Sequence, residues 1–474
     1  MNKIKFIRKE LIMKNFKILK KMIFGFILYS FSFSQNLGCF FSIPSCIAYA
    51  KDSKDLKKTK NTKNIEKEPK KIERKKEGYN LNCGDVEVNA LNGAVLIDVS
   101  NNDILYSKGE IDKDGEIKVA PMASTTKIMS AVIALEKMNG EVMKRLKTVH
   151  KDAIMVEGTS MGLSEGDKVT TEDLLYGMLL KSGNDAANEV AVRVIEHMIE
   201  VGEIELEEDK EKLTVKECIE KFVELMNNKA KELGLQNIKF SSPSGLGPED
   251  ILYSKKYAKN ETSARDLAIL TSYALKKAKF KEICSTPKKT VVIENEGREY
   301  KREKRTYYNH NKLIREKSGF YYQYACGVKT GFTKEAGRCL VAAAEKNGVL
   351  LVAVVLKDKD DWVDCVKLFE YGFSKYEEVD VKKEIPENKR IENIKFKDYG
   401  KDGKDVFFKV KQDDKKKSIY LRKNRKNKAK IERKIIANPI QFNVKKGENI
   451  GKVEYYNDGK FVGDSKIYVD EIFE

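Results

Sequence analysis

The sequence predicts an α/β domain at residues 80–375 followed by a small all-β domain at residues 376–474. Its length of 474 residues is too great for one ordinary hydrophobic core. Before residue 375 the chain combines apolar residues at helical spacing with long apolar runs. After residue 376, short β-prone runs alternate with turns rich in Lys, Asp, Gly and Asn. These two patterns predict two domains of different class.

Residues 1–50 have the pattern of a secretory signal peptide. An apolar run from Met22 to Phe33 follows a basic stretch, and Ala48-Tyr49-Ala50 forms a small-residue cleavage site. The segment from Met13 onward is already a complete signal, so a start at Met13 is a second interpretation. We therefore expect export to the extracytoplasmic face of the membrane or the cell wall, with an uncleaved anchor as the alternative.

The basic charge of the chain is concentrated in its N-terminal part. The net charge is +18, to which residues 1–50 contribute +7 and residues 51–77 contribute +6. Residues 51–79 form a charged linker rich in Lys, Glu, Asp and Asn, a composition typical of disorder. Because little excess charge is left for a folded face, we expect no nucleic-acid partner. Membrane-surface association is expected only through the N-terminus.

The first chemical motif is a Ser-x-x-Lys sequence formed by Ser124 and Lys127. Apolar residues recur at helical spacing directly after it, at Ile128, Met129, Val132, Ile133 and Leu135. This spacing predicts that Ser124 opens a helix and that Lys127 lies one turn further on the same face. An amine in that position can reach the serine hydroxyl.

The second motif is Ser182-Gly183-Asn184. The pattern predicts one helix over residues 172–181, with Thr170 and Thr171 as capping candidates, and another over residues 185–198. The motif therefore falls in a tight loop between two helices. Such a loop can direct two polar side chains into a cleft.

The third motif is Lys329-Thr330-Gly331. It precedes two apolar runs, residues 339–344 and 349–356, which are separated by Asn347-Gly348. Asn-Gly between apolar runs is a strong signal of a β-hairpin. We therefore expect Lys329 on a strand beside that hairpin.

Each motif also has a chance copy elsewhere in the chain. Ser285 begins a second Ser-x-x-Lys, but Pro287 disfavours the helix that would align its two ends. Ser100 lies in a polar turn between two apolar runs, which is ordinary hairpin chemistry. Lys317-Ser318-Gly319 is a second copy of the third motif. The order and context of the first set predict one site of nucleophilic serine chemistry activated by lysine.

Longer segments around the motifs resemble the D-alanyl-D-alanine carboxypeptidases, which are low-molecular-weight penicillin-binding proteins. The resemblance covers about residues 88–375 and is carried by residues 123–129, 173–187, 263–268 and 327–337. It implies a penicillin-binding/β-lactamase-like transpeptidase fold, in which helices flank an antiparallel sheet and a helical subdomain is added. Residues 376–474 resemble more loosely the β-rich C-terminal domain of that family.

The resemblance implies catalytic roles for three residues. Ser124 is the nucleophile that accepts the acyl group, Lys127 is its general base, and Ser182 passes a proton to the leaving amine. An ammonium cannot accept a proton, so burial and the nearby positive Lys329 must lower the pKa of Lys127. This chemistry needs neither a metal nor a cofactor. The implied reaction removes the terminal D-alanine of peptidoglycan pentapeptides, with β-lactam antibiotics as covalent inhibitors.

The resemblance also implies a substrate-binding set. Asn184 holds a backbone amide of the substrate, and Lys329 with Thr330 binds the terminal carboxylate. Backbone N–H groups of Ser124 and Phe332 form the oxyanion hole. The complete expected set is Asn184, Lys329, Thr330, Gly331, Phe332 and Thr333.

This chain differs from the usual family pattern at three positions. Cys326 replaces an Asp common before the third motif, Phe332 replaces a frequent His, and Ser244 replaces the His of a Pro-His-Gly-Leu segment. These changes remove no catalytic group, but they are expected to affect rate and pH dependence. The cysteines are dispersed and lack metal-ligand spacing, so structural thiols are the first interpretation, and a place in the cleft lining is the alternative for Cys326.

Three alternative functions are compatible with parts of the sequence. A serine β-lactamase shares the three motifs, and its deacylating base would be Glu224, although that residue falls in an amphipathic pattern. Ser160 lies in a Gly-x-Ser-x-Gly sequence like a nucleophile elbow, but a turn follows it where a helix is required. A non-catalytic wall-binding protein is the third alternative. Arg265 and Asp266 have two interpretations, a structural ion pair or a substrate contact.

Overall fold

The computed structural model describes residues 86–473, apart from residues 112–114, 208–209, 248–258, 297–299, 381–395, 400–404, 413–417, 423–430, 438–444 and 458. The expected signal peptide at residues 1–50 and the expected linker at residues 51–79 lie outside the described residues. Among the helices that are described, none is both long enough and apolar enough to cross a membrane.

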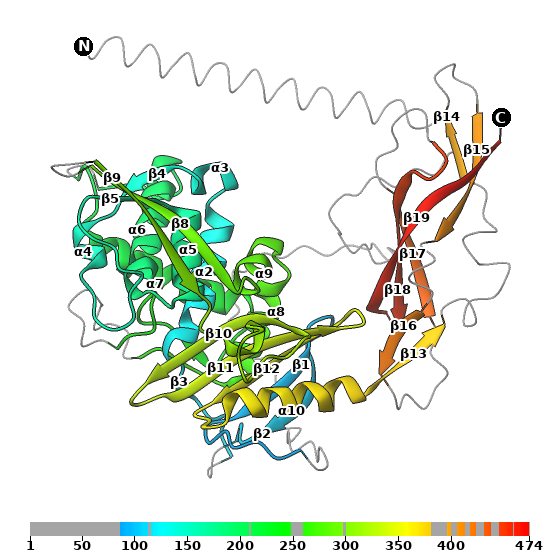
Figure 1. The fold of residues 1–474 in the computed structure, drawn as a ribbon, viewed down its shortest axis with the longest axis horizontal. Helices are drawn as coiled ribbons and strands as arrows, with labels where there is room; N and C mark the ends of the chain where they lie inside the picture. Colours follow the sequence, from blue (N-terminus) through cyan, green and yellow to red (C-terminus); the bar gives the residue numbers. More distant parts are fainter. Residues whose placement is uncertain are drawn as a thin grey trace, which may run out of the picture. The chain divides into compact units, whose positions relative to one another are not determined.

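A five-stranded antiparallel sheet forms the centre of the first domain (Figure 1). Its strands run in the order β10-β11-β12-β1-β2, which leaves β10 at one edge. Their bounds are β1 Ala94–Asp98, β2 Asp103–Lys108, β10 Ala325–Thr333, β11 Gly337–Lys346 and β12 Val349–Leu356. The predicted hairpin is confirmed, because Asn347 and Gly348 join β11 to β12 with positive φ angles of 55° and 80°.

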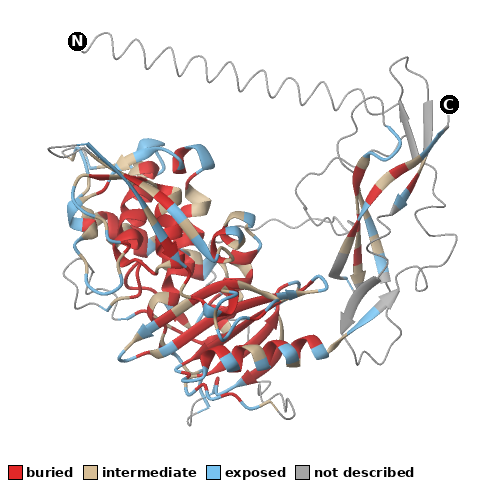
Figure 2. Ribbon diagram, in the orientation of Figure 1, coloured by how far each residue is buried: buried red, intermediate tan, exposed pale blue. Residues whose placement is uncertain are grey.

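Alternate residues of the central strands supply two hydrophobic cores. On β12, Val352 and Val354 face the helical side, whereas Leu351 and Ala353 face the opposite side. Helix α8 (Ala264–Leu275) packs on the first face, and helix α10 (Asp361–Ser374) covers the second. The sheet is therefore buried on both faces, as Figure 2 shows in red. Each such aliphatic side chain contributes roughly 1.5–3 kcal/mol through burial.

A helical subdomain adjoins the sheet. It contains α2 (Lys127–Lys137), α5 (Thr171–Leu180), α6 (Asn184–Glu200), α7 (Val215–Glu232) and α9 (Ala278–Cys284). The predicted helices over residues 172–181 and 185–198 are confirmed as α5 and α6. Thr170 caps α5, since its side chain accepts a hydrogen bond from Asp173 N at 3.0 Å.

Short helices and small sheets complete this domain. A four-stranded sheet in the order β4-β5-β8-β9 includes the long ribbon β8–β9, which sequence reasoning did not predict. The remaining elements are β3 Ala120–Pro121, η1 Ala123–Thr126, α3 Gly140–Met143, β4 Leu146–Thr148, α4 Lys151–Ile154, β5 Asp167–Thr170, β6 Ile238–Lys239, β7 Glu261–Thr262, β8 Lys288–Glu296, β9 Tyr300–Tyr308 and η2 Lys312–Ile314.

The described part of the C-terminal region is all-β, as predicted. One sheet has the order β14-β15-β19-β18-β17, and β13 pairs with β16. The strands are β13 Tyr376–Asp380, β14 Phe396–Tyr399, β15 Asp405–Gln412, β16 Ser418–Arg422, β17 Ile431–Ala437, β18 Asn449–Asn457 and β19 Lys460–Phe473. These strands agree with the alternation of β-prone runs and turns in the sequence of this region.

Candidate active site

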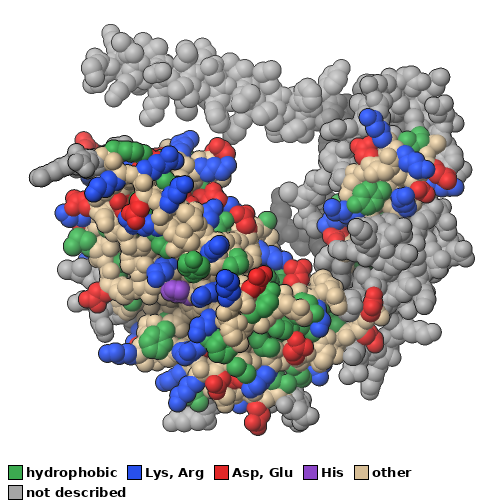
Figure 3. Space-filling view, viewed as in Figure 1, with side chains coloured by type: hydrophobic (Ala, Val, Ile, Leu, Met, Phe, Trp, Pro, Cys, Tyr) green, Lys and Arg blue, Asp and Glu red, His purple; other side chains and the backbone are tan. Residues whose placement is uncertain are grey.

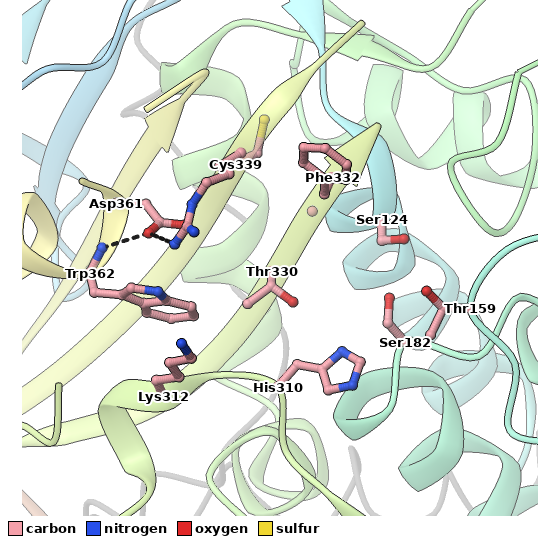
Figure 4. A pocket seen from close by; sticks show the side chains of 12 residues that line it. Ser124, Thr159, Ser182, His310, Lys312, Thr330, Phe332, Cys339, Asp361 and Trp362 are labelled. Atoms are coloured by element: carbon pink, nitrogen blue, oxygen red, sulfur yellow. Dashed lines mark hydrogen bonds and ion pairs between the residues drawn. The ribbon is translucent and has the colours of Figure 1, made fainter. Parts of the chain in front are cut away.

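The three motifs converge on one pocket of about 390 Å³ beside the edge strand β10. Ser124 comes from η1, Ser182 from the loop between α5 and α6, and Thr330 from β10. Figure 4 shows Ser124 and Ser182 at one end of the pocket and Lys312 and Trp362 at the other, with Thr330 between them. Residues far apart in the sequence therefore form one site.

The local structure at Ser124 differs in one respect from the prediction. Ser124 lies in the 3₁₀ turn η1, and the α-helix begins only at Lys127. The reason is local, because the hydroxyls of Thr125 and Thr126 donate to the carbonyls of Met122 and Ala123 at 2.7 and 2.8 Å and tighten the turn. The expected proximity is nevertheless present, with Lys127 Nζ 3.0 Å from Ser124 Oγ.

Lys127 is fully buried, and the hydrogen-bond acceptors that it has among the described residues are neutral. Besides Ser124, its Nζ donates to Asn184 Oδ1 at 2.8 Å and to the Ser244 carbonyl at 2.6 Å. Burial and the ammonium of Lys329 hold the pKa of Lys127 well below its usual range, and Asp185 opposes this shift only in part. The expected lowering of this pKa, by burial and by Lys329, is therefore present. A neutral amine next to a serine hydroxyl can act as a base.

The second motif is fixed by a loop that packs over the start of α6. Asn184 N donates to the Thr159 carbonyl at 2.7 Å, and Asn184 Nδ2 donates to the Glu157 carbonyl at 2.7 Å. The carboxylate of Asp185 accepts from Ser160 Oγ at 2.6 Å and Met161 N at 2.8 Å. Ser160 is thus a loop-anchoring residue with no helix directly after it, which excludes the nucleophile elbow.

Lys329 is buried, with 1% of its surface exposed, and does not itself line the pocket. Its Nζ donates to Ser182 Oγ and to the Thr330 carbonyl, each at 2.8 Å. Burial lowers the pKa of Lys329 to about 7. The site therefore holds two buried amines with lowered pKa values, one on each serine.

The strand β10 supplies the pocket wall with Thr330, Gly331 and Phe332. A Cβ at Gly331 would lie 2.8 Å from the Met122 carbonyl oxygen, so only glycine allows this close approach. Thr333 does not line the pocket, and its hydroxyl accepts a hydrogen bond from Ala336 N at 3.0 Å. Cys326 does not line it either, whereas Cys339 does.

Several pocket residues were not found by sequence reasoning. They are Thr159, His310, Lys312, Arg338, Asp361 and Trp362. Arg338 and Asp361 form an ion pair, with Arg338 Nε 3.2 Å from Asp361 Oδ2. No motif or periodicity marks these residues, because their neighbourhood exists only after the sheet and α10 have assembled.

Three residues of the chance copies and alternatives, Ser285, Glu224 and Asp266, do not line this pocket. Ser285 ends α9 and its hydroxyl donates to the Glu282 carbonyl at 3.2 Å, while Lys288 begins β8. Glu224 is an exposed residue of α7 and is not part of the pocket lining, so the β-lactamase alternative lacks its expected base there. Asp266 accepts from Asn237 N at 2.6 Å, which favours a structural role.

One face of the described residues carries both signs of charge (Figure 3), and positive charges act on one end of the pocket. Figure 3 shows Lys and Arg side chains interspersed with Asp and Glu side chains on the visible face of the described residues. At the end of the pocket near Ser182, the positive charges of Lys329, Lys181 and Arg315 act on His310. That end of the pocket therefore favours an anionic group.

The sequence matches two family models. The model described as D-alanyl-D-alanine carboxypeptidase matches residues 82–195 and 216–360, and the model described as penicillin-binding protein 5, C-terminal domain, matches residues 381–474. The second match coincides with the all-β region.

Similar proteins share this description over much of their length. D-alanyl-D-alanine carboxypeptidase DacF of Bacillus subtilis is 29% identical over 383 residues, covering 80% of this chain and 84% of that protein. A D-alanyl-D-alanine carboxypeptidase of Streptomyces sp. K15 is 30% identical over 257 residues, covering 53% of this chain and 78% of that protein. The crystal structure of the Streptomyces K15 DD-transpeptidase superposes with a TM-score of 0.50 at 27% identity, covering 61% of this chain and 98% of that chain.

Proposed function

Because the chain belongs to the D-alanyl-D-alanine carboxypeptidase family, we propose that Ser124, Lys127 and Ser182 carry the reaction of that family in this protein. The protein is a serine D-Ala-D-Ala carboxypeptidase acting on peptidoglycan. Membership implies a peptide substrate, β-lactam binding and an extracytoplasmic location. The observation that best supports the proposed roles is the 3.0 Å contact between Ser124 Oγ and the buried Lys127 Nζ, whose hydrogen-bond partners in the described part of the chain include no carboxylate.

In the proposed acylation step, neutral Lys127 takes the proton of Ser124 as its oxygen attacks the carbonyl carbon of the penultimate D-alanine. The backbone N–H groups of Ser124 and Phe332 stabilise the oxyanion. Ser182 gives a proton to the leaving amine, and the proton held by Lys127 replaces it, which returns Lys127 to the neutral amine. Lys329 Nζ, 2.8 Å from Ser182 Oγ, holds that hydroxyl in place. Hydrolysis of the Ser124 ester then releases the shortened peptide, with Lys127 again as the base.

Substrate recognition is proposed to follow the edge of β10. Asn184 holds a backbone amide, while Gly331, Phe332 and Thr333 provide the strand along which the peptide lies. Lys329 and Thr330 bind the terminal carboxylate. A carboxylate ligand favours the ammonium form of Lys329, whose pKa of about 7 places it between its two forms near neutrality.

The proposal also specifies the natural substrate, the inhibitors and the location of the protein. The substrate is the pentapeptide of peptidoglycan, and β-lactams acylate Ser124 covalently. Residues 1–50 direct export, and any attachment to the membrane surface is through this segment. The domain boundaries at residues 79 and 375 stay predictions from the sequence.

Mass spectrometry of the intact protein after incubation with penicillin tests the catalytic assignment. We expect one covalent adduct, located on Ser124, and release of D-alanine from a peptide that ends in D-Ala-D-Ala. Ser124→Ala should abolish both reactions, whereas the matched variant Ser285→Ala, which alters the chance Ser-x-x-Lys copy, should retain both. An adduct that persists in Ser124→Ala would refute the nucleophile, and rapid turnover of penicillin would favour the β-lactamase alternative.

A further inference from the structure

The segment from Asn309 to Lys312 presents a histidine to the pocket from a firmly anchored backbone. Asn309 is buried, and its Nδ2 donates to the carbonyls of Cys284 and Thr286, each at 3.1 Å. Its Oδ1 accepts from Asn311 N at 2.9 Å. These bonds fix the chain on both sides of His310.

The backbone of His310 is also tied to the element that carries Ser182. His310 N donates to the Leu180 carbonyl at 2.9 Å, at the end of α5 and two residues before Ser182. Figure 4 shows the imidazole directed toward Ser182, with Thr330 beside it. The ring is thus held at the side of the pocket where the proposed mechanism places the departing D-alanine.

The imidazole has an unused hydrogen-bonding capacity. Within the described part of the chain, its ring nitrogens make no hydrogen bond, although the side chain lines the pocket. Burial, followed by the positive charges of Lys329, Lys181 and Arg315, lowers the pKa of His310 to about 4. The ring is therefore neutral at physiological pH, and one of its nitrogens is an acceptor.

From this geometry we propose that His310 positions the water molecule that hydrolyses the Ser124 acyl-enzyme. The inference rests on the proposed function, because it requires an ester on Ser124. Release of D-alanine vacates the space between His310, Ser182 and Thr330, and water enters there. The surrounding Lys and Arg side chains only donate hydrogen bonds, whereas neutral His310 accepts one from the water and orients its oxygen.

Hydrolysis of the Ser124 ester needs only the water molecule and the side chains already assigned. The water oxygen bonds to the acyl carbon, and the bond from that carbon to Ser124 Oγ breaks. One water proton passes to Lys127 Nζ and then to Ser124 Oγ. The other proton, which is hydrogen-bonded to His310, stays with the released carboxylic acid. His310 undergoes no net change and acts as a positioning residue.

Separate measurement of acylation and deacylation with a fluorescent penicillin tests this role. His310→Phe keeps a planar ring but removes both nitrogens. We expect it to leave acylation within about threefold of wild type and to slow deacylation about tenfold, the worth of one hydrogen bond in the transition state. His310→Gln, which restores an acceptor, should recover most of the loss. Tyr308→Phe, at an exposed position two residues earlier, should change neither rate.

The outcomes separate this proposal from the proposed function. If wild-type protein forms no adduct on Ser124, the catalytic assignment itself fails. If acylation is normal but His310→Phe deacylates at the wild-type rate, only the role of His310 is refuted. Equal slowing of both steps, without recovery in His310→Gln, would also refute it, because that pattern describes a structural histidine. Should His310→Phe not fold, His310→Ala carries the same expectation, and its acylation rate reports folding.

Discussion

Two basic side chains at helix α6 are fully buried, and their surroundings differ. Lys127 contacts the first residue of α6, whereas Arg193 is itself a residue of the helix. Arg193 Nε lies 2.6 Å from Glu189 Oε1, and its two other nitrogens donate to the carbonyls of Val169 and Lys147 at 2.8 and 2.9 Å. Lys127 has hydrogen bonds of similar length, but its acceptors within the described ranges, Ser124, Asn184 and the Ser244 carbonyl, are all neutral.

The ion pair of Arg193 with Glu189 is part of a larger network of charged side chains. His150 Nδ1 lies 3.1 Å from Glu189 and its Nε2 lies 3.0 Å from Glu196. The hydrogen bonds that His150 donates to Glu189 and Glu196 raise the pKa of His150 to about 10, so this histidine is a cation at neutral pH. Such a buried network holds α6 to α4 and to the strands β4 and β5.

Asp185, whose charge raises the pKa of Lys127, has its hydrogen bonds elsewhere. Asp185 accepts hydrogen bonds from the loop that carries Ser160 and Met161, so its charge only partly compensates Lys127. The comparison teaches that burial alone does not define a catalytic lysine. A buried guanidinium keeps its proton in any surroundings, and its ion pair here serves the fold, whereas a buried lysine amine without a paired carboxylate tends to lose its proton and becomes a base.

The largest expected effect comes from a substitution that keeps a permanent positive charge at position 127. Lys127→Arg keeps a cation, but a guanidinium does not lose its proton in proteins. We expect acylation by a fluorescent penicillin to slow by about 10²- to 10⁴-fold, the usual contribution of a general base. Near-normal acylation in a folded Lys127→Arg protein would mean that this lysine has only a structural role.

The next prediction concerns the ion pairs that Glu189 forms with Arg193 and His150. Glu189→Gln leaves Arg193 and His150 without their shared carboxylate, and loss of one partner of a buried ion pair costs about 3–5 kcal/mol of unfolding free energy. Denaturant unfolding measures this loss, while acylation of the folded protein should stay close to wild type. Glu200→Gln is the matched control on the same helix, because its half-exposed pair with Lys147 is worth less than about 1 kcal/mol. A large fall in acylation without loss of stability in Glu189→Gln would contradict the claim that Glu189 serves the fold and Lys127 serves catalysis.

The sequence was sufficient for the parts of the site that are local in the chain. The spacing of Ser124 and Lys127, the loop between α5 and α6, and the hairpin after Lys329 each depend on patterns within a short stretch of sequence. Each of these predictions agrees with the structure, apart from the 3₁₀ turn at Ser124. That turn depends on the hydroxyls of Thr125 and Thr126, whose alternative hydrogen bonds a helical pattern does not reveal.

Features made by tertiary packing were not predictable in this way. His310 and Trp362 come from irregular or terminal positions, and they line one pocket only after the sheet, the segment before η2 and the start of α10 have assembled. The strand β9 consists mainly of charged and polar residues that are exposed along most of its length, so it lacks the alternation that marks a half-buried strand. The pairing of Arg193 with Glu189 has ordinary helical spacing, and nothing in the sequence marks it as buried.

The most direct test of the central claim is the pKa of Lys127 itself, measured by NMR of protein labelled with ¹³C at the lysine ε-carbons. The signal is assigned by its absence in Lys127→Arg. We expect it to titrate well below the ordinary lysine value of 10.5, because burial and Lys329 favour the neutral amine. The acylation rate should rise with pH through the same transition and then level off, since only the deprotonated amine accepts the Ser124 proton. A Lys127 signal that titrates at 10.5 or above would contradict the account.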